Sequence, residues 1–322
     1  MSPVPPPSPL AVVLNESAGT LLRTPLAWLA ADIRDRFAEA GVEALVVTAA
    51  SKTVEAAIRR AVASDVRAVV IGGGDGTVAT AAGLLLGTGK ALGVLPLGTM
   101  NLLARDLGMP VDLPSAVAVL ARGHIRRIDV AEVNGRIFLN NSLIGLFPSL
   151  VRARERQRGV PGWRLWPAMF SAVYKALRYY NLLDVSIDFG SGGRLVRIPA
   201  LAVVNNAYSD RGAGFLGRPL LDEGRLGVYL ATHRTRLGLV RLMAGLVLGG
   251  WQGDAELEAL TVTELTVSSH RRRLRVANDG EVMRLTPPLI YRIRPQALPV
   301  LVPAPPPALL PGKEVAAWNK AS

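Results

Sequence analysis

The stretch AVVIGGGDGTVATAAGLLL, residues 68–86, decides the fold of the first half of the chain. It begins with a β-branched run typical of a buried strand, turns at the glycines of GGGDGT and continues with apolar residues at helical spacing. Glycines at a strand-to-helix turn leave backbone N–H groups accessible, and the start of the following helix attracts anions. The stretch therefore predicts a turn that binds phosphate, with a plain βα turn capped by Asp75 as the alternative.

Strands and helices alternate on both sides of this stretch. Strands are expected at residues 11–14, 44–47, 68–71 and 92–95, and helices at residues 25–40, 53–63 and 77–86. This order is typical of a doubly wound α/β sheet, in which helices connect parallel strands. We assign residues 9–127 to such a domain.

A different pattern begins after residue 127, where short alternating strands are separated by Gly and Asn turns. These strands are expected at residues 128–133, 137–143, 201–205, 226–230, 260–267 and 274–277. They predict a second domain, residues 128–302, built as a mostly antiparallel β-sandwich. Helical insertions near 162–180 and 237–251 interrupt it, and the proline-rich tail, 303–322, is expected to pack back on the first domain.

Composition narrows the classes of function. The 322 residues are 50% hydrophobic and 19% charged, as in a soluble globular protein. The 37 Lys and Arg outnumber the 25 Asp and Glu, and a net charge of +12 favours nucleic acid, nucleotide phosphates or an anionic membrane as a partner. The sequence has no cysteine, which excludes disulfides, thiolate catalysis and sulfur-ligated zinc. It has no apolar run long enough to span a membrane and no signal-peptide pattern at its start, so we expect a cytosolic protein.

A second strand-turn-helix unit, GVLPLGTMNLLARDLGMP, occupies residues 93–110. Its Gly98-Thr99 turn follows a strand next to the first, and open α/β sheets bind ligands at the carboxyl ends of such strands. The two turns together predict a cradle for a nucleotide. Asp75 adds a carboxylate suited to a magnesium ion that bridges phosphates, or to a ribose hydroxyl.

GGGDGTV followed by LPLGTMNLLARDLGMP closely resembles the catalytic domain shared by diacylglycerol kinases, sphingosine kinases and bacterial lipid kinases, and the resemblance extends over residues 10–302. It implies a phosphofructokinase/NAD kinase-like fold for the first domain. It also implies a phosphate loop at NESAG, residues 15–19, where Glu16 stands in place of a common proline. The nucleotide-binding residues expected from the turns and the resemblance are Asn15, Ser17, Gly19, Thr48, Gly73, Gly74, Asp75, Gly76, Thr77, Gly98, Thr99 and Asn101.

The resemblance also implies metal ligands. Asp129 in RRIDVAEVNG matches an acidic residue at the domain junction, and DEGRL matches a structural magnesium site in which Glu223 replaces the usual Asp. Relatives often have Asp after the Asn of the second turn, where this chain has Leu102, and this departure indicates a divergent bacterial branch that leaves magnesium to Asp75 and Asp129. The expected ligands are Asp75, Asp129, Glu223 and the carbonyl groups of Leu220 and Arg225.

The last motif is RVANDGEVMRL, whose Asp279-Gly280-Glu281 resembles the family's Asp-Gly-Glu turn. In that family the turn carries the carboxylate proposed as general base. The resemblance therefore implies Asp279 as the catalytic base, with Glu281 as the second candidate. By itself, Asn-Asp-Gly between two strands indicates only a hairpin.

Three segments suit a lipid substrate. Residues 151–180 hold seven Lys or Arg, one acid and six aromatic residues, a mixture that binds anionic headgroups at a membrane interface, although a helix with inward-facing aromatics is the alternative. Residues 237–251 are apolar on nearly every side, as in the wall of an acyl-chain pocket or in a buried core helix. The basic run HRRRLR, residues 270–275, leads to Asp279 and is expected either to hold phosphates or to form a solvated edge.

These features predict an ATP- and Mg²⁺-dependent lipid kinase that phosphorylates a hydroxyl of a neutral membrane lipid, with diacylglycerol as the preferred acceptor. Ceramide or a sphingoid base is the alternative acceptor, while NAD kinase and a lipid-binding protein without activity are the alternative functions. The expected partners are the lipid and an anionic membrane surface at the inner face of the cytoplasmic membrane, with a homodimer as a further association. No nucleic-acid-binding module is visible, so nucleic acid is not an expected partner.

Overall fold

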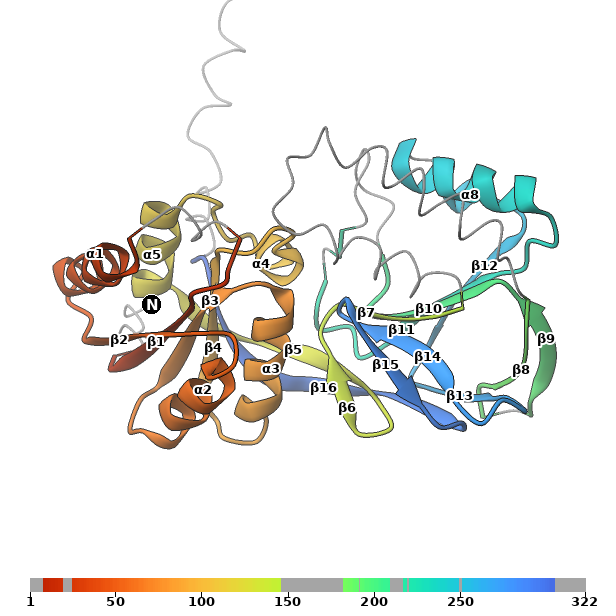
Figure 1. Ribbon diagram of the computed structural model, residues 1–322, viewed down its shortest axis with the longest axis horizontal. Coiled ribbons are helices and arrows are strands. Elements are labelled where there is room, and N and C mark those ends of the chain that lie inside the picture. The colour runs from red at the N-terminus through yellow and green to blue at the C-terminus, as the bar shows by residue number, and fades with distance from the viewer. Residues whose placement is uncertain are drawn as a thin grey trace, which may run out of the picture.

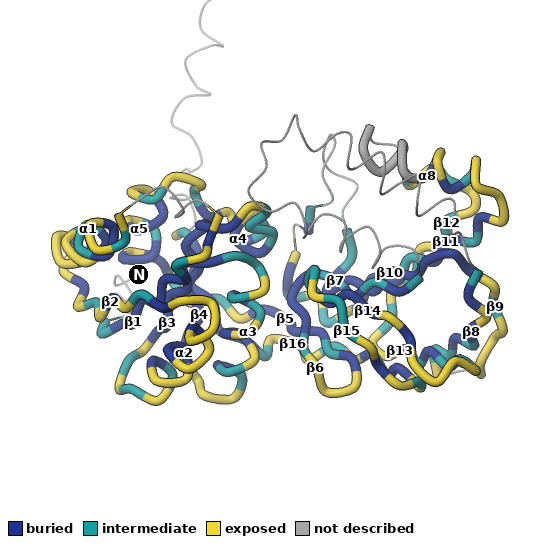
Figure 2. Tube along the Cα trace, viewed as in Figure 1, coloured by how far each residue is buried: buried dark blue, intermediate teal, exposed yellow. Residues whose placement is uncertain are grey.

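The computed structural model describes residues 8–19, 25–145, 182–190, 192–208, 217–218, 220–248 and 251–304. These residues form two lobes side by side (Figure 1). The first lobe combines helices with a parallel sheet, and the second consists mostly of strands. Buried residues line the strands of both lobes (Figure 2).

The first lobe is the expected doubly wound sheet. Its elements are β1 (Leu10–Asn15), α1 (Leu26–Glu39), β2 (Ala44–Ala49), α2 (Val54–Ala63), β3 (Ala68–Gly73), α3 (Asp75–Leu85), β4 (Ala91–Pro96), α4 (Leu102–Asp106) and α5 (Leu113–Arg122). The strands are parallel in the order β2-β1-β3-β4. The chain therefore reverses direction across the sheet between β1 and β3, which is where open α/β sheets bind ligands.

Helices cover both faces of this sheet, with α1 beside α5 and α2 beside α3. Because both faces are covered, β1, β3 and β4 are buried along their whole length, as their apolar sequences require. Helix α5 was not among the expected elements. Its signals are Asp112, whose carboxylate accepts a 2.9 Å hydrogen bond from the N–H of Ser115, and a proline in the first turn.

The second lobe is the expected antiparallel β-sandwich. Its elements are β5 (His124–Val133), β6 (Arg136–Phe138), β7 (Asn141–Gly145), β8 (Leu183–Asp188), β9 (Arg194–Ile198), β10 (Ala200–Asn205), β11 (Leu226–Ala231), α8 (Arg236–Leu248), η3 (Trp251–Gly253), β12 (Leu257–Val262), β13 (Glu264–Ser268), β14 (Leu274–Asn278), β15 (Glu281–Leu285) and β16 (Leu289–Val302). One sheet has the order β12-β11-β10-β7-β14-β15, and the facing sheet contains β16, β13, β8 and β9. Apolar residues of both sheets form one core, including Ile144 and Val203 from the first and Leu265 and Tyr291 from the second.

Strand β16 joins the two lobes. Its first residues pair with β13 in the sandwich, both of its parts pair with β5, and Val300 near its end is aligned with Leu92 of β4. A register shift between Arg294 and Leu298 lets one strand serve both regions. The end of the expected second domain, 128–302, therefore lies in the sheet of the first lobe.

Two expected strands are each divided in the structure. The run 137–143 breaks between β6 and β7, because the N–H groups of Leu139 and Asn140 turn away from the ladder to bind a carboxylate described below. The run 260–267 breaks at Thr263, where the chain passes from one sheet of the sandwich to the other. A continuous β-type pattern gives no sign of such a change of sheet.

The expected helix at 237–251 is present as α8 followed by η3. Leu239 and Leu242 are buried, whereas Leu237 is 78% exposed, so the described part of α8 has an exposed apolar side and is not a fully buried core helix. The insertion expected at 162–180 and the tail after residue 304 lie outside the described residues. Among the described helices, none is long and apolar enough to cross a membrane.

Candidate functional site

Three turns meet at the carboxyl ends of β1, β3 and β4. A Cβ on Gly98 would lie 2.6 Å from the Cα of Gly74, so the turns after β3 and β4 are in direct backbone contact. A Cβ on Gly19 would lie 3.2 Å from Oγ1 of Thr99, so the loop after β1 lies against the turn after β4. The glycines expected to form a nucleotide cradle are therefore neighbours in the structure.

Asn15 fastens the first turn to the second. Its Nδ2 donates a 2.9 Å hydrogen bond to Oγ1 of Thr77, and its Oδ1 accepts hydrogen bonds from the N–H of Ser17 and the hydroxyl of Ser51. Thr48 lies near the end of β2, in register with the end of β1. The structure thus gathers these expected residues, while their contacts with a nucleotide stay a prediction.

The start of α3 is open to a ligand. Gly74 is the N-cap residue of this helix, and apart from the adjoining residues and the backbone of the helix itself, no heavy atom lies within 4 Å of the position that a Cβ on Gly74 or on Gly76 would occupy. A Cβ on Gly73, by contrast, would lie 3.0 Å from Cβ of Thr77. Exposed backbone N–H groups at a helix N-terminus attract phosphate, so this open side suits a polyphosphate.

Asn101 holds the turn after β4 in shape. It adopts a left-handed conformation with φ 51°, which Asn tolerates better than most residues. Its Nδ2 donates to the carbonyl groups of Pro96 (3.0 Å) and Gly98 (2.9 Å), and its Oδ1 accepts a 2.8 Å hydrogen bond from the N–H of Gly98. Asn101, expected among the nucleotide-binding residues, is therefore engaged in supporting the Gly98-Thr99 turn.

Asp75, the first residue of α3, links two turns. Its Oδ1 accepts a 2.8 Å hydrogen bond from the N–H of Leu102, the first residue of α4. Burial raises the pKa of Asp75, and backbone N–H groups at the start of α4 oppose that rise. The carboxylate thereby fixes α4 relative to the glycine turn.

Asp279 sits in a cradle of backbone N–H groups. It occupies the turn between β14 and β15 with φ 46°, and its Oδ2 accepts a 2.7 Å hydrogen bond from Leu139. Its Oδ1 accepts hydrogen bonds from Asn140 (2.8 Å) and Asn141 (3.1 Å). Burial raises the pKa of Asp279, while these N–H groups and the positive charge of Arg218 act against the rise. A carboxyl group held rigidly with a raised pKa is suited to accept a proton.

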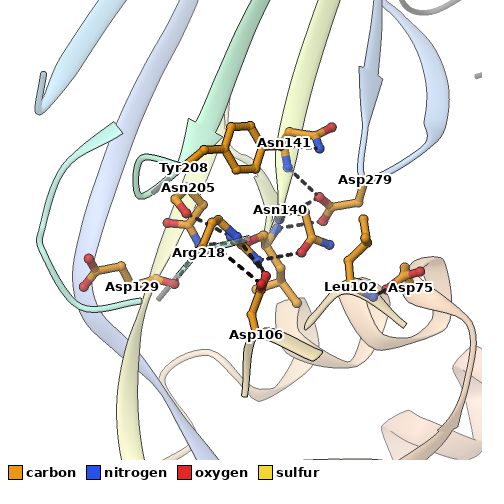
Figure 3. Close-up of polar contacts among 11 residues, drawn as sticks. Asp75, Leu102, Asp106, Asp129, Asn140, Asn141, Asn205, Tyr208, Arg218 and Asp279 are labelled. Atoms are coloured by element: carbon orange, nitrogen blue, oxygen red, sulfur yellow. Dashed lines mark hydrogen bonds and ion pairs between the residues drawn. The ribbon is translucent and has the colours of Figure 1, made fainter. Parts of the chain in front are cut away.

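The structure places Asp279 opposite the nucleotide turns. Figure 3 shows the side chain of Leu102 directed toward Asp279, with Asp75 on the other side of Leu102. Asp279 of the late turn and Asp75 of the early glycine turn thus lie on either side of Leu102. Glu281, the second candidate base, is exposed at the start of β15 and pairs in the ladder with Asn278.

A buried ion pair at this junction was not found from the sequence. Arg218 is 3% exposed and binds Asp106 of α4, with 2.9 Å between Nε and Oδ2. Figure 3 shows this pair between Asp279 and Asp129, surrounded by Asn140 and Asn205. Asp106 lies in the quoted segment 93–110 and Arg218 lies four residues before DEGRL, but nothing in the sequence pattern indicates that the two side chains meet.

The expected metal ligands are not gathered in one place. Both carboxylate oxygens of buried Asp129 accept backbone hydrogen bonds, from Gly224 (2.6 Å) and Gln296 (2.7 Å), and Figure 3 places Asp129 across Arg218 from Asp75. Asp129 therefore secures the junction of β5 and β16 here, which does not support its expected role beside Asp75.

The second expected metal site is a surface loop. The side chain of Glu223 is exposed, Leu220 is 47% exposed, and the carbonyl group of Arg225 accepts a 3.1 Å hydrogen bond from the N–H of Asn206. Within the described ranges, no group of three or more His, Asp and Glu side chains could hold a metal ion. The expected site at Glu223 stays a prediction.

Two family models match the chain. The diacylglycerol kinase catalytic domain matches residues 9–133, and the YegS C-terminal NAD kinase beta sandwich-like domain matches residues 163–302. The two matches correspond closely to the two lobes.

Relatives support the same assignment. A protein of Pseudomonas aeruginosa named "Probable lipid kinase YegS-like" is 32% identical over 84% of this chain and 88% of its own length. A diacylglycerol kinase of Mycobacterium tuberculosis is 31% identical over 76% of this chain and 79% of its own length. The crystal structure of a diacylglycerol kinase from Bacillus anthracis covers 95% of this chain and 100% of its own with a TM-score of 0.68 at 17% identity, which supports the fold.

Proposed function

Because the chain belongs to the diacylglycerol kinase family of lipid kinases, we propose that it transfers the γ-phosphoryl group of ATP to a hydroxyl group of diacylglycerol. The observation that carries this proposal is the position of Asp279, held by three backbone N–H groups and facing the glycine turns across Leu102. A phosphoryl donor and a proton acceptor would then meet at one junction.

In this proposal, one set of residues binds the nucleotide and another accepts the proton. The N–H groups at the start of α3 and in the Gly98-Thr99 turn bind and orient the phosphates of ATP. Asp279 accepts the hydroxyl proton of the lipid as the lipid oxygen attacks the γ-phosphorus and ADP leaves. The raised pKa of Asp279 improves this proton transfer, because a weakly acidic carboxyl is the better base.

Magnesium fits this arrangement with few protein ligands. Mg²⁺ in phosphoryl-transfer sites is held largely by phosphate oxygens and water, with one or two carboxylates. Asp75 lies beside the glycine turn and would be such a ligand, whereas both oxygens of Asp129 are already bound to N–H groups. When bound, the ion neutralises charge on the phosphates.

A lipid acceptor is favoured over NAD by an aromatic row beside the base. Nδ2 of Asn141 donates a 3.3 Å hydrogen bond to the hydroxyl of Tyr208, whose ring lies 5.6 Å from that of Tyr229, which in turn lies 5.5 Å from that of Trp251. This row runs from the Asp279 cradle toward α8 and η3, and it offers apolar surface to acyl chains. Ceramide or a sphingoid base would use the same surface, so each is the alternative acceptor.

Membrane contact belongs to the same proposal. The basic and aromatic segment 151–180 lies outside the described residues, and its role in docking to an anionic membrane at the inner face of the cytoplasmic membrane rests on its composition. Vesicle sedimentation tests it: binding to anionic vesicles should fall with added salt, and equal binding to neutral vesicles would refute it. Association as a homodimer is tested by sedimentation of the protein alone.

The decisive assay incubates the protein with ATP labelled at the γ-phosphate, Mg²⁺ and micelles of diacylglycerol, ceramide, sphingosine or phosphatidylglycerol, with NAD in a parallel reaction. Label on diacylglycerol above the other lipids supports the proposal. Label on ceramide or sphingosine alone assigns the alternative acceptor. Label on NAD and on no lipid refutes a lipid kinase.

A further inference from the structure

Arg218 is the most heavily engaged buried side chain at the junction of the lobes. Its Nε and Nη2 bind the carboxylate of Asp106, and Nη2 also donates a 2.7 Å hydrogen bond to Oδ1 of Asn140. Its Nη1 donates to the carbonyl groups of Leu139 and Asn205, and its backbone N–H donates to Asp106. One side chain therefore joins α4 of the first lobe to the strand ends of the second.

The segment held by Arg218 is the one that holds the base. Leu139 and Asn140 give their carbonyl oxygen and side chain to Arg218, and they give their N–H groups to Asp279. Hydrogen bonds in such a chain polarise one another, so a cation on the carbonyl side strengthens the donors that face Asp279. The position of Asp279 thus depends on Arg218 without direct contact between them.

Asp106, the partner of Arg218, lies on the helix that follows the nucleotide turns. Asp106 ends α4, a helix of five residues, and Leu102 at its start donates its N–H to Asp75. Asn101, which holds the Gly98-Thr99 turn, directly precedes this helix and so connects it to that turn. The pair of Arg218 and Asp106 therefore lies on the path between the phosphate-binding side and Asp279.

Folding stability alone does not account for the buried ion pair between Arg218 and Asp106. The side chains of Arg218 and Asp106 are 2% and 12% exposed, and the desolvation of a buried ion pair offsets much of its attraction. Replacing a buried ion pair by apolar residues of similar volume often leaves the folding stability unchanged or raises it. Its many directed hydrogen bonds instead fix one geometry between two lobes.

We propose that Arg218, together with Asp106, is a positioning residue that sets Asp279 relative to the nucleotide turns. This inference rests on the proposed function, since it assigns Asp279 the role of base. Arg218 touches neither the base nor the glycine turns, and it acts through the segment between β6 and β7 and through α4.

The charges of Arg218 and Asp106 allow a positioning role to be distinguished from a purely structural role. Arg218 is positive and Asp106 is negative; of the other titratable groups described, Tyr208 interacts with Asp279, Asp75 lies across Leu102, and Glu281 is two residues along the same turn. Removing the positive charge should raise the pKa of Asp279, and removing the negative charge should lower it. Since Asp279 works as a base when ionised, the acid limb of kcat should move to higher pH in Arg218→Met and to lower pH in Asp106→Asn.

The experiment compares four variants of the full chain in the diacylglycerol assay as a function of pH: Arg218→Met, Arg218→Lys, Asp106→Asn and the control Arg197→Met. Arg197 forms an exposed ion pair with Asp184, at 2.6 Å, on the outside of the second lobe. Loss of alignment should lower kcat about 10- to 100-fold in Arg218→Met with little change in KM for ATP. Arg218→Lys should recover part of kcat and keep the acid limb near its original pH, and Arg197→Met should match the unmodified protein.

Opposite shifts of the acid limb in Arg218→Met and Asp106→Asn support the inference, and an unmoved acid limb in both overturns it. If Arg218→Met does not fold, as judged by circular dichroism, a shift of the acid limb to lower pH in Asp106→Asn beside an unmoved limb in Arg218→Lys supports the inference, and an unmoved limb in both overturns it. Titration of the Asp279 carboxyl by NMR, assigned with Asp279→Asn, gives the shifts without any turnover. A protein that labels no lipid but shows these NMR shifts would refute the proposed function and leave the coupling intact.

Discussion

The glycine turns and the Asp279 cradle bind charge with the same groups, backbone N–H donors, but they are built differently. The turns follow parallel strands, and each is formed by residues close together in the sequence. The cradle brings Asp279 to N–H groups of residues 139–141, which lie 138 to 140 positions earlier in the chain. A site made of local turns is visible as a motif, whereas a site made across a sandwich depends on strand pairing.

The two regions also differ in what fills them. The space next to Gly74 and Gly76 leaves room for a ligand, while the cradle already holds a side chain of the protein. Under the proposed function, we therefore expect the turns to determine nucleotide affinity and the cradle to determine the rate of transfer. The following variants test that division.

Replacing Asp279 by Asn should have the largest effect. Without a proton acceptor, kcat should fall about 10²- to 10⁴-fold, while the dissociation constant for ATP changes little. Nucleotide binding by calorimetry and lipid labelling on the same preparation measure both. The control is Glu281→Gln, because Glu281 is exposed in the same turn; activity lost in the control but kept in Asp279→Asn would reverse the assignment of the base.

Two alanine substitutions separate packing from ligand binding in the turns. A Cβ on Gly98 would lie 2.6 Å from the Cα of Gly74, so Gly98→Ala should cost about 1–3 kcal/mol of folding stability and weaken ATP binding. Gly74→Ala meets no neighbour, so its stability should stay within about 0.5 kcal/mol while its KM for ATP rises. Thermal unfolding and ATP kinetics distinguish the two. Normal ATP kinetics in Gly74→Ala would show that this turn does not bind the phosphates of ATP.

The pH dependence of stability should report on Asp279. Burial raises the pKa of Asp279 above its ordinary value of 3.8, so the folded state binds this proton more tightly than the unfolded state. Its contribution to stability is therefore greatest at low pH and is lost as the pH rises through the folded pKa. Urea unfolding from pH 4 upward, roughly the ordinary Asp range, should show a steeper decline in the unmodified protein than in Asp279→Asn. Parallel curves for the two proteins would contradict a raised pKa.

The smallest effect is expected for the link between the first two turns. Thr77→Val keeps the shape of the side chain but removes the oxygen that accepts the 2.9 Å hydrogen bond from Asn15. Loss of one such bond costs about 0.5–1.5 kcal/mol, so KM for ATP should rise about 3- to 10-fold with kcat nearly unchanged. Thr80→Val serves as the control, because the hydroxyl of Thr80 bonds only within α3. Equal kinetics in both variants would show that the loop after β1 does not contribute to ATP binding.

Much of the first lobe could be predicted because its strands and helices are continuous in the sequence. The strand ending at Gly73 and the turn after it fold as their pattern indicates, and the same holds for the turn at Gly98. The family resemblance supplied Asp279, which a hairpin pattern alone would have left as a turn residue.

Other features depend on tertiary contacts that no local pattern carries. The break at Leu139 and Asn140 exists because their N–H groups bind Asp279, so a β-type pattern read alone extends one strand through it. Arg218 and Asp106 meet across 112 positions, and no local pattern indicates their contact. Asp129 was expected at a metal because the family resemblance implied it, yet its two oxygens accept hydrogen bonds from backbone groups of two other segments.

The most direct measurement is a crystal structure of the protein with Mg²⁺ and a non-hydrolysable ATP analogue. The phosphates should lie on the open side of Gly74 and Gly76, with the γ-phosphate directed across Leu102 toward Asp279. A γ-phosphate directed away from Asp279, or a nucleotide bound elsewhere, would contradict the claim that the glycine turns and the Asp279 cradle form one active site.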